Sequence, residues 1–239
     1  YTTMKQIINT VGLLVTVMIT GIASAVAQTS IGGSWTKTDG TTITTWLFQD
    51  GHYSCTQYDI ANKRFDWTMG GDYTLSDDQL NMKFFFHTAT KEKVGTDEAV
   101  KFSISNQTLS INKEGSSQTY TRMDDGKAPL AGHWLITGRV VNGNMQTITP
   151  GARRTIKLLT GSRFQWIAIN VETKEFFGTG GGTYTFVNGK YTETIEFFSR
   201  DSSRVGASLS FDGKVEGNNW HHSGLSSRGE PIHEIWTRN

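Results

Sequence analysis

Histidines and carboxylates gather near the end of the chain, where they could bind a metal or transfer protons. His221 and His222 are adjacent, and His233 directly precedes Glu234. Imidazole nitrogens and carboxylate oxygens are ligands that zinc accepts in a tetrahedral site. Adjacent residues of a regular strand point to opposite faces, so His221 and His222 would not share one metal ion. We therefore expect no metal at His221, His222 and His233, and interpret them as solvated residues at strand ends.

Two carboxylates, Glu193 and Glu196, suggest hydrolysis of a glycosidic bond, but their spacing argues against it. Catalytic carboxylates must converge on the bond that they cleave, whereas residues three apart on a strand lie on opposite faces. We expect Glu193 to face solvent. Inside a barrel it would need a cationic partner, and Arg153, Arg154 or Arg163 could supply one.

Glycine-rich segments and the single cysteine carry no catalytic signature. The run Gly178–Gly182 is not followed by the Lys-Ser/Thr pair of a phosphate-binding loop, and the chain has no Gly-x-Ser-x-Gly nucleophile motif. We interpret this run, and the similar pair Gly70-Gly71, as a tight turn, a bulge or a close crossing of strands. Cys55 has no histidine or basic residue beside it and is expected to be a small apolar core residue. We predict no catalytic residue and no cofactor.

Composition narrows the class of protein. The 239 residues include 23 basic and 22 acidic side chains, one cysteine, 36% hydrophobic and 11% aromatic residues. This charge balance does not favour binding to nucleic acid, which needs a clustered basic surface. One cysteine excludes an internal disulfide framework, and the aromatic content argues against a disordered chain.

The first 27 residues have the composition of an export signal. Lys5 provides a positive charge, Val11–Ile19 is mainly apolar, and Ala23–Ala27 ends in an Ala-x-Ala pattern. This order predicts a secretory signal peptide over residues 1–27, with residues 1–3 preceding the initiator and cleavage after Ala27. The apolar runs are too short for a spanning helix. We expect a periplasmic or extracellular protein without a transmembrane anchor after processing.

An internal duplication organises the rest of the chain. Shifting the sequence by 111 residues aligns Tyr53–Gly95 with Phe164–Gly206, and ten of the 43 pairs are identical. We predict two homologous units, residues 31–123 and 131–239, joined by a polar linker over residues 124–130. Both units contain short runs of β-branched and aromatic residues between Gly, Asn and Asp turns, such as Thr42–Phe48 and His52–Tyr58. Such a pattern is typical of an antiparallel barrel or sandwich.

The ends of the two units resemble those of the calycins, the group of lipocalins and fatty-acid-binding proteins. Each unit begins with Gly-x-Trp, at Gly33–Trp35 and Gly132–Trp134, and closes with an arginine, Arg122 or Arg238. The resemblance implies an all-β fold of two tandem, small, antiparallel up-and-down barrels. It also implies that Trp35 with Arg122, and Trp134 with Arg238, plug one end of each barrel. The second unit is similar to uncharacterised lipocalin-like domains exported by Bacteroidetes-type bacteria.

These observations favour a non-enzymatic, exported binding protein whose barrel mouth takes a small, partly apolar or amphipathic molecule. The second unit is the favoured binder, because Trp166 replaces Cys55 and Tyr191 replaces Leu80. The predicted ligand-binding residues are Phe164, Trp166, Tyr184, Tyr191, Glu193, Phe197 and Trp220. One alternative is a module for binding carbohydrate or for surface assembly, whose partner would be a glycan. The other is a calycin-fold enzyme that uses the region of His221, His222 and Glu234.

Overall fold

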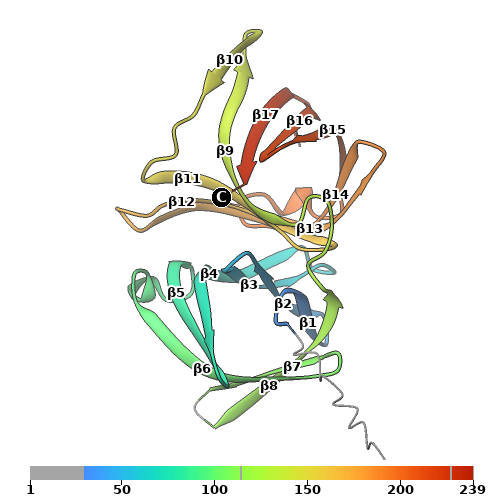
Figure 1. Ribbon diagram of the computed structural model, residues 1–239. Helices are drawn as coiled ribbons and strands as arrows, with labels where there is room; N and C mark the ends of the chain where they lie inside the picture. The colour runs from blue at the N-terminus through green and yellow to red at the C-terminus, as the bar shows by residue number, and fades with distance from the viewer. Residues whose placement is uncertain (1–29, 114, 227, 239) are drawn as a thin grey trace, which may run out of the picture.

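The fold is all-β, as the sequence predicts: two closed, antiparallel, eight-stranded barrels in tandem (Figure 1). It is given by a computed structural model that describes residues 30–113, 115–226 and 228–238. The predicted signal peptide lies outside these residues. Within the described part of the chain, no helix has the length and apolar character needed to cross a membrane.

The first barrel is a simple meander in which each strand pairs with the next, and β8 returns to pair with β1. A single 3₁₀ turn, η1 (Lys91–Lys93), interrupts the connection between β5 and β6. Its strands are β1 (Gly33–Asp39), β2 (Thr42–Gln49), β3 (His52–Asp59), β4 (Arg64–Ser76), β5 (Gln79–His87), β6 (Asp97–Ser105), β7 (Thr108–Lys113) and β8 (Ser116–Asp124).

The second barrel repeats this order with one addition. After β9 the chain doubles back as the short strand β10, which pairs with the far half of β9, while β11 pairs with the near half. Pairing of β17 with β9 closes the barrel. The elements are β9 (Gly132–Val141), β10 (Asn144–Thr147), β11 (Arg153–Leu159), β12 (Arg163–Asn170), β13 (Glu175–Val187), β14 (Lys190–Phe198), the 3₁₀ turn η2 (Ser202–Arg204), β15 (Ser208–Glu216), β16 (Asn219–Leu225) and β17 (Pro231–Arg238).

The glycine pairs lie inside strands, where the register shifts and neighbouring backbones approach closely. A bulge and a close crossing of strands are two of the three features that their sequence predicts. The pairs belong to β4 and β13, each 13 residues long, and the register shifts at Gly70/Gly71 and again at Gly181/Gly182. A Cβ atom at Gly71 would overlap the carbonyl oxygen of Lys83, and one at Gly182 would overlap that of Thr194. Glycine is therefore required where two strands approach this closely.

A tryptophan beneath an arginine closes one end of each barrel. Trp35 is fully buried, its Nε1 donates to the Ile31 carbonyl at 2.7 Å, and the Arg122 guanidinium lies 3.9 Å from its ring. In the second barrel the Nε1 of Trp134 donates to the Leu130 carbonyl at 2.9 Å, and the Arg238 guanidinium lies 4.7 Å from the ring. Each plug combines aromatic burial with a cation–π contact.

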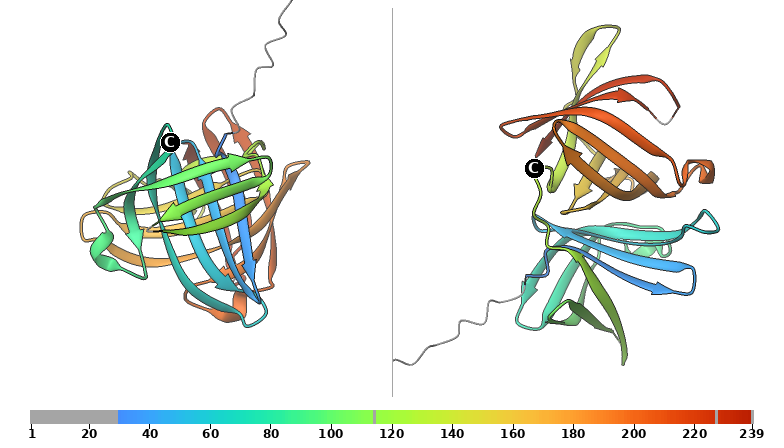
Figure 2. Two further views of the ribbon diagram at one scale, coloured as in Figure 1. Left: turned by 90° about the horizontal axis from the view of Figure 1, so that it is seen from below. Right: turned by 90° about the vertical axis from the view of Figure 1, so that its right-hand side faces the viewer.

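The two barrels pack wall to wall, with β2, β3 and β4 facing β11 and β14 (Figure 2). An apolar cluster of Phe86 with Ile156, Ile167 and Ile169 joins the two barrels, and a polar group lies beside it. Gln165 donates to the hydroxyls of Thr68 and Thr179 at 3.0 Å each and accepts from Thr56 at 3.1 Å. Thr68 and Thr179 are equivalent in the duplication. One buried glutamine amide thus joins matching positions of both units, and all its hydrogen-bonding groups are used within the interface.

Two acidic groups extend these contacts. The carboxylate of Asp124, at the end of β8, accepts from the backbone N–H of Gly161 at 2.8 Å and from the hydroxyls of Ser34 and Thr160 at 2.5 and 2.9 Å. Burial acts to raise the pKa of Asp124, but these hydrogen bonds hold it below its usual value. Glu196 accepts from Tyr58 at 2.6 Å across the interface. These partly buried carboxylates add hydrogen bonds between the two barrels.

A stacked histidine pair at the same interface should make the fold sensitive to acid. The rings of His52 and His133 lie 3.7 Å apart, and burial, reinforced by the charge of His52, lowers the pKa of His133 to about 3. Asp72 partly opposes this shift, and Arg154 adds to it. Because the unfolded chain takes up a proton near pH 6.5 and the folded chain does not, stability is greatest above that pH and falls as the pH decreases toward 3.

Because His133 stays neutral in the folded protein, we expect it alone to lower the free energy of unfolding by about 2 kcal/mol when the pH falls from 7 to 5. His133→Phe keeps a ring against His52 and removes the titrating group. Its free energy of unfolding should therefore fall by about 2 kcal/mol less than that of the parent protein over the same pH interval. Chemical denaturation at the two pH values measures the difference. An equal acid-induced loss in the variant and the parent would show that His133 does not carry the effect.

Candidate ligand-binding site

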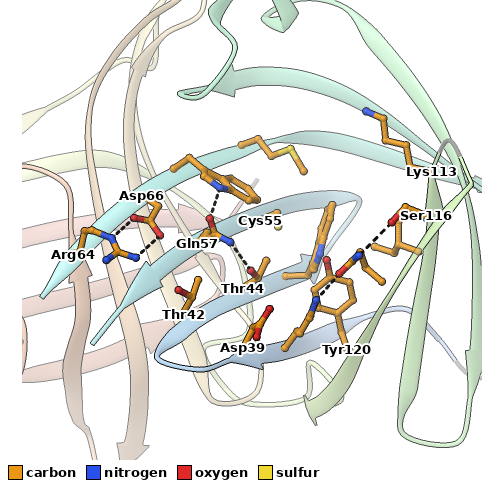
Figure 3. Close-up of a pocket in the computed structure, with 16 residues that line it drawn as sticks. Asp39, Thr42, Thr44, Cys55, Gln57, Arg64, Asp66, Lys113, Ser116 and Tyr120 are labelled. Carbon is orange, nitrogen blue, oxygen red and sulfur yellow. Dashed lines mark hydrogen bonds and ion pairs between the residues drawn. The ribbon is translucent and has the colours of Figure 1, made fainter. Parts of the chain in front are cut away.

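A cavity of about 810 Å³ opens at the unplugged end of the first barrel (Figure 3). This volume lies in the range of small-molecule sites. The cavity is bounded by β1, β2, β3, β4, β7 and β8. Its lining consists of Lys37, Asp39, Thr42, Thr44, Trp46, Cys55, Gln57, Arg64, Asp66, Trp67, Met69, Ile111, Lys113, Ser116, Gln118 and Tyr120.

The deep part of the cavity is apolar and aromatic. Trp46 is 4% exposed and stacks on Phe48 with ring centroids 5.5 Å apart, while the edge of Tyr120 meets it at 6.2 Å. Cys55 is buried beside them, in the core position that its sequence surroundings predict. Strand alternation explains the set, because Trp46 and Phe48 on β2 and Tyr120 on β8 all point inward.

Polar side chains line the walls above this floor. Gln57 accepts from the indole Nε1 of Trp67 at 2.7 Å and donates to the hydroxyl of Thr44 at 3.3 Å. On the β8 side, Gln118 accepts from Lys37 at 2.5 Å and donates to Ser116 at 3.3 Å. Figure 3 shows Thr44 and Gln57 on one wall, with Ser116 and Tyr120 on the other. A molecule in the cavity would therefore meet apolar rings below and hydrogen-bonding groups above.

Two of the cations that line the cavity form salt bridges. Arg64 donates to Asp66 at 2.5 Å. Lys113 lies 2.8 Å from Glu98, which also binds Lys93 at 2.5 Å. Burial acts to raise the pKa of Glu98, but the hydrogen bonds and charges of the two lysines keep it below its usual value. Arg64 and Lys113 thus face carboxylates of the protein itself.

The interior of the second barrel is occupied by its own side chains. Tyr191 and Trp220 are fully buried with ring centroids 5.0 Å apart, and Tyr184 lies 5.6 Å from Tyr191. Phe164 meets Tyr191 edge-on at 6.4 Å. The structure therefore brings these four predicted ligand-binding residues together, but as a packed core.

Two other predicted residues lie apart from that core centre. Phe197 faces the first barrel and contacts Tyr58, with ring centroids 4.8 Å apart, because the bulge at Gly181/Gly182 reverses the alternation of β14. Trp166 packs at the edge of the core, 5.3 Å from Phe198. The seven predicted residues are thus divided between the barrel core, its edge and the interface.

Glu193 faces inward, which corrects the expectation that it is solvated. It is 7% exposed, its Oε2 lies 3.6 Å from Lys157 Nζ, and it accepts from the hydroxyl of Tyr191 at 3.0 Å. The cation is therefore Lys157, and not Arg153, Arg154 or Arg163. The rings of Tyr191, Trp220 and Trp236 surround the ammonium group at 5.1 to 5.2 Å, which supplements the ion pair with cation–π contacts.

His222 is also buried, whereas the sequence suggests a solvated strand end. It is 2% exposed, and its Nδ1 lies 3.6 Å from Glu234, just beyond a hydrogen bond. Burial, then the charge of Lys157, lowers the pKa of His222. His221 points outward toward Glu216, as strand alternation predicts. Among the described residues, no group of three or more His, Cys, Asp or Glu side chains could hold a metal ion.

The duplication shows how the two interiors diverged. Trp46 is the cross-strand partner of Trp35, and Lys157 is the cross-strand partner of Trp134. Trp46 and Lys157 are therefore equivalent positions of the two barrels. By the same comparison Met82 corresponds to Glu193, Ile111 to His222 and Gln118 to Glu234. Three of these four first-barrel residues line the open cavity. In the second barrel Lys157, Glu193 and His222 are buried, and Glu234 is partly buried next to His222.

Sequence reasoning missed the first-barrel cavity because it sought a binding site where aromatic residues are most numerous. The signal that points to the cavity is a small residue where the other barrel has a large one. Cys55 is far smaller than its counterpart Trp166, and Met69 corresponds to Gly180, which packs against the Trp166 indole. A small side chain leaves volume inside a barrel, while a large one fills it.

No family model matches the chain, and no curated protein matches it at significant similarity.

Proposed function

We propose that this protein is an exported, non-enzymatic carrier or receptor that binds a small amphipathic molecule in the mouth of its first barrel. The observation that carries the proposal is the cavity of about 810 Å³ with a floor of aromatic rings and walls of polar side chains. Binding sites for small molecules combine these two features, since apolar walls supply affinity and a few polar groups fix orientation. Membership of the lipocalin-like exported proteins, and location in the periplasm or outside the cell, belong to the same proposal.

The second barrel has a supporting role in this proposal. Its interior is filled by buried rings and by the cluster of Lys157, Glu193 and His222, and its wall packs against β2 and β3 of the first barrel. Those two strands carry Trp46, Cys55 and Gln57 of the cavity. A rigid wall behind these strands fixes the positions of the binding residues before the ligand arrives.

The carbohydrate alternative is less favoured by the surface. Stacking on sugar faces needs exposed aromatic rings, whereas every large hydrophobic side chain exposed among the described residues is aliphatic or Met. The enzyme alternative would use His221, His222 and Glu234. It is less favoured because His222 is buried between the rings of Phe211 and Trp220, while His221 points outward toward Glu216.

Filling the cavity tests the proposal. Thr44→Trp places an indole in the space above Trp46 and should reduce the affinity for an environment-sensitive fluorescent fatty acid at least tenfold. Thr185→Trp, at an exposed position of the second barrel, is the matched control and should bind the probe like the parent protein. Circular dichroism and thermal melting establish that both variants are folded. Saturable binding unchanged by Thr44→Trp would place the site elsewhere, and failure of the parent protein to bind any apolar probe would refute the proposal.

A further inference from the structure

The walls that pack against each other in the two barrels carry matched residues of the duplication (Figure 2). Ten pairs of residues are identical after a shift of 111 positions. Three of these pairs have both members at the contact between the barrels: Phe65 with Phe176, Thr68 with Thr179, and Phe86 with Phe197. The two units therefore meet through equivalent parts of the same wall.

Each phenylalanine of the last pair meets the same position of the opposite unit. Phe86 of the first barrel belongs to one apolar cluster with Ile169 of the second. Phe197 of the second barrel packs against Tyr58 of the first, with ring centroids 4.8 Å apart. Tyr58 and Ile169 are equivalent in the duplication. Contacts that are repeated in both directions define a two-fold, isologous interface, in which both partners use one patch.

Matched glycines make room for both phenylalanine rings. A Cβ atom at Gly70 would lie 2.5 Å from Cζ of Phe86, and one at Gly181 would lie 2.6 Å from Cζ of Phe197. A side chain at either glycine would displace the ring that reaches the other barrel. The duplication retains the contact together with the space that it needs.

The two halves of the contact differ in polarity. The half around Phe86 contains three second-barrel isoleucines: Ile156, Ile167 and Ile169. The equivalent first-barrel residues around Phe197 are polar: Thr45, Thr56 and Tyr58. Tyr58 donates to Glu196 at 2.6 Å, and Glu196 also accepts from Arg163 at 2.8 Å. The second barrel thus supplies the apolar residues of one half and the charged residues of the other.

The wall of the second barrel fits a copy of itself better than the wall of the first barrel does. Between two second barrels, the Phe197 ring of each copy would meet the isoleucines of the other, and the arginine–glutamate pair would remain within each copy. Between two first barrels, Tyr58 would lose its acceptor. Ser54 would also stand in place of Gln165, which leaves Thr68 without its amide donor. Loss of partners by buried polar groups is costly.

We propose that the wall formed by β11, β12, β13 and β14 of the second barrel is a self-complementary docking surface whose partner is a second copy of the same barrel. In the intact chain the first barrel, itself a diverged copy, covers this wall. The proposal concerns the outside of the barrels and does not depend on what the cavity binds. A two-fold interface closes after two copies, so we expect a pair and no larger assembly.

Opening the covalent link tests the proposal in the full-length protein. A protease site inserted after Lys127, in the linker, allows the folded chain to be cut between the barrels, and native mass spectrometry then counts the fragments in each complex. The parent protein should remain a one-to-one complex after cutting. Phe86→Ala removes a first-barrel ring that a pair of second barrels does not use. It should therefore weaken the one-to-one complex at least tenfold and release second-barrel fragments that pair with one another.

Phe197→Ala is the matched variant, because it removes the equivalent ring from the second barrel. It should weaken the one-to-one complex as well, and its second-barrel fragment should stay monomeric. Val187→Ala, at a position 62% exposed at the end of β13, should behave like the parent protein, and thermal melting of the uncut variants establishes that they are folded. Second-barrel fragments from Phe86→Ala that stay monomeric or aggregate, or first-barrel fragments that pair equally well, would overturn the proposal, as would a one-to-one complex that Phe86→Ala leaves unweakened.

Discussion

Replacing Lys157 by Met is expected to lower the free energy of unfolding by about 3–5 kcal/mol, because it leaves Glu193 as an uncompensated charge inside the second barrel. Both side chains are buried, and their charged atoms lie 3.6 Å apart. Methionine keeps most of the apolar stem that packs among Tyr191, Trp220 and Trp236, so the loss should come mainly from the charge. Equilibrium denaturation at pH 7 measures it.

The paired substitution separates charge from packing. Lys157→Met combined with Glu193→Leu removes both charges and should recover most of the lost stability, since buried ion pairs often contribute little compared with apolar residues of similar size. The exposed pair Lys190–Asp212, 2.7 Å apart on the surface of the same barrel, is the control, and Lys190→Met should change stability by less than about 1 kcal/mol. A double variant as unstable as Lys157→Met alone would show that packing, and not the unpaired carboxylate, causes the loss.

The architecture could be predicted because the duplication preserves the residues that shape it. The matched glycines Gly70/Gly181 and Gly71/Gly182 form equivalent bulges, and the matched threonines Thr68 and Thr179 meet at one glutamine. Backbone geometry and the contact between barrels depend on these positions. Sequence identity between the two units therefore reports on their shared fold.

The site could not be predicted in the same way, because it depends on positions where the units differ. Trp46 and Lys157 lie outside the segment that aligns without gaps, and the longer connection containing β10 hides their correspondence. Whether Glu193 faces in or out depends on a register that one residue reverses, and its partner Lys157 comes from a strand three places away in the sheet. Cavity volume is the sum of many side chains and is not visible in any one motif.

Trp134→Ala is expected to lower the free energy of unfolding by about 3–5 kcal/mol, as truncations of large buried aromatic residues do. The side chain is fully buried, contacts Trp220 with ring centroids 5.7 Å apart, and donates to the Leu130 carbonyl. Its loss would leave a void next to the cluster that contains Lys157. Chemical denaturation measures the change, and a loss below about 1 kcal/mol would show that the barrel end is not closed by this residue.

Double-mutant cycles measure the coupling free energy between the arginine and the tryptophan of each plug. Arg122 lies 3.9 Å from the Trp35 ring and donates to the carbonyls of Gly32 and Ser30 at 2.8 and 2.6 Å. Arg238 lies 4.7 Å from the Trp134 ring and donates to the Pro129 carbonyl at 3.3 Å. We expect coupling of about 1 kcal/mol for the first pair and less for the second, because the cation–π attraction weakens with distance and exposure. Strict additivity in both cycles would mean that the arginines are held by the loop carbonyls alone, and stronger coupling at Trp134 than at Trp35 would contradict the geometric argument.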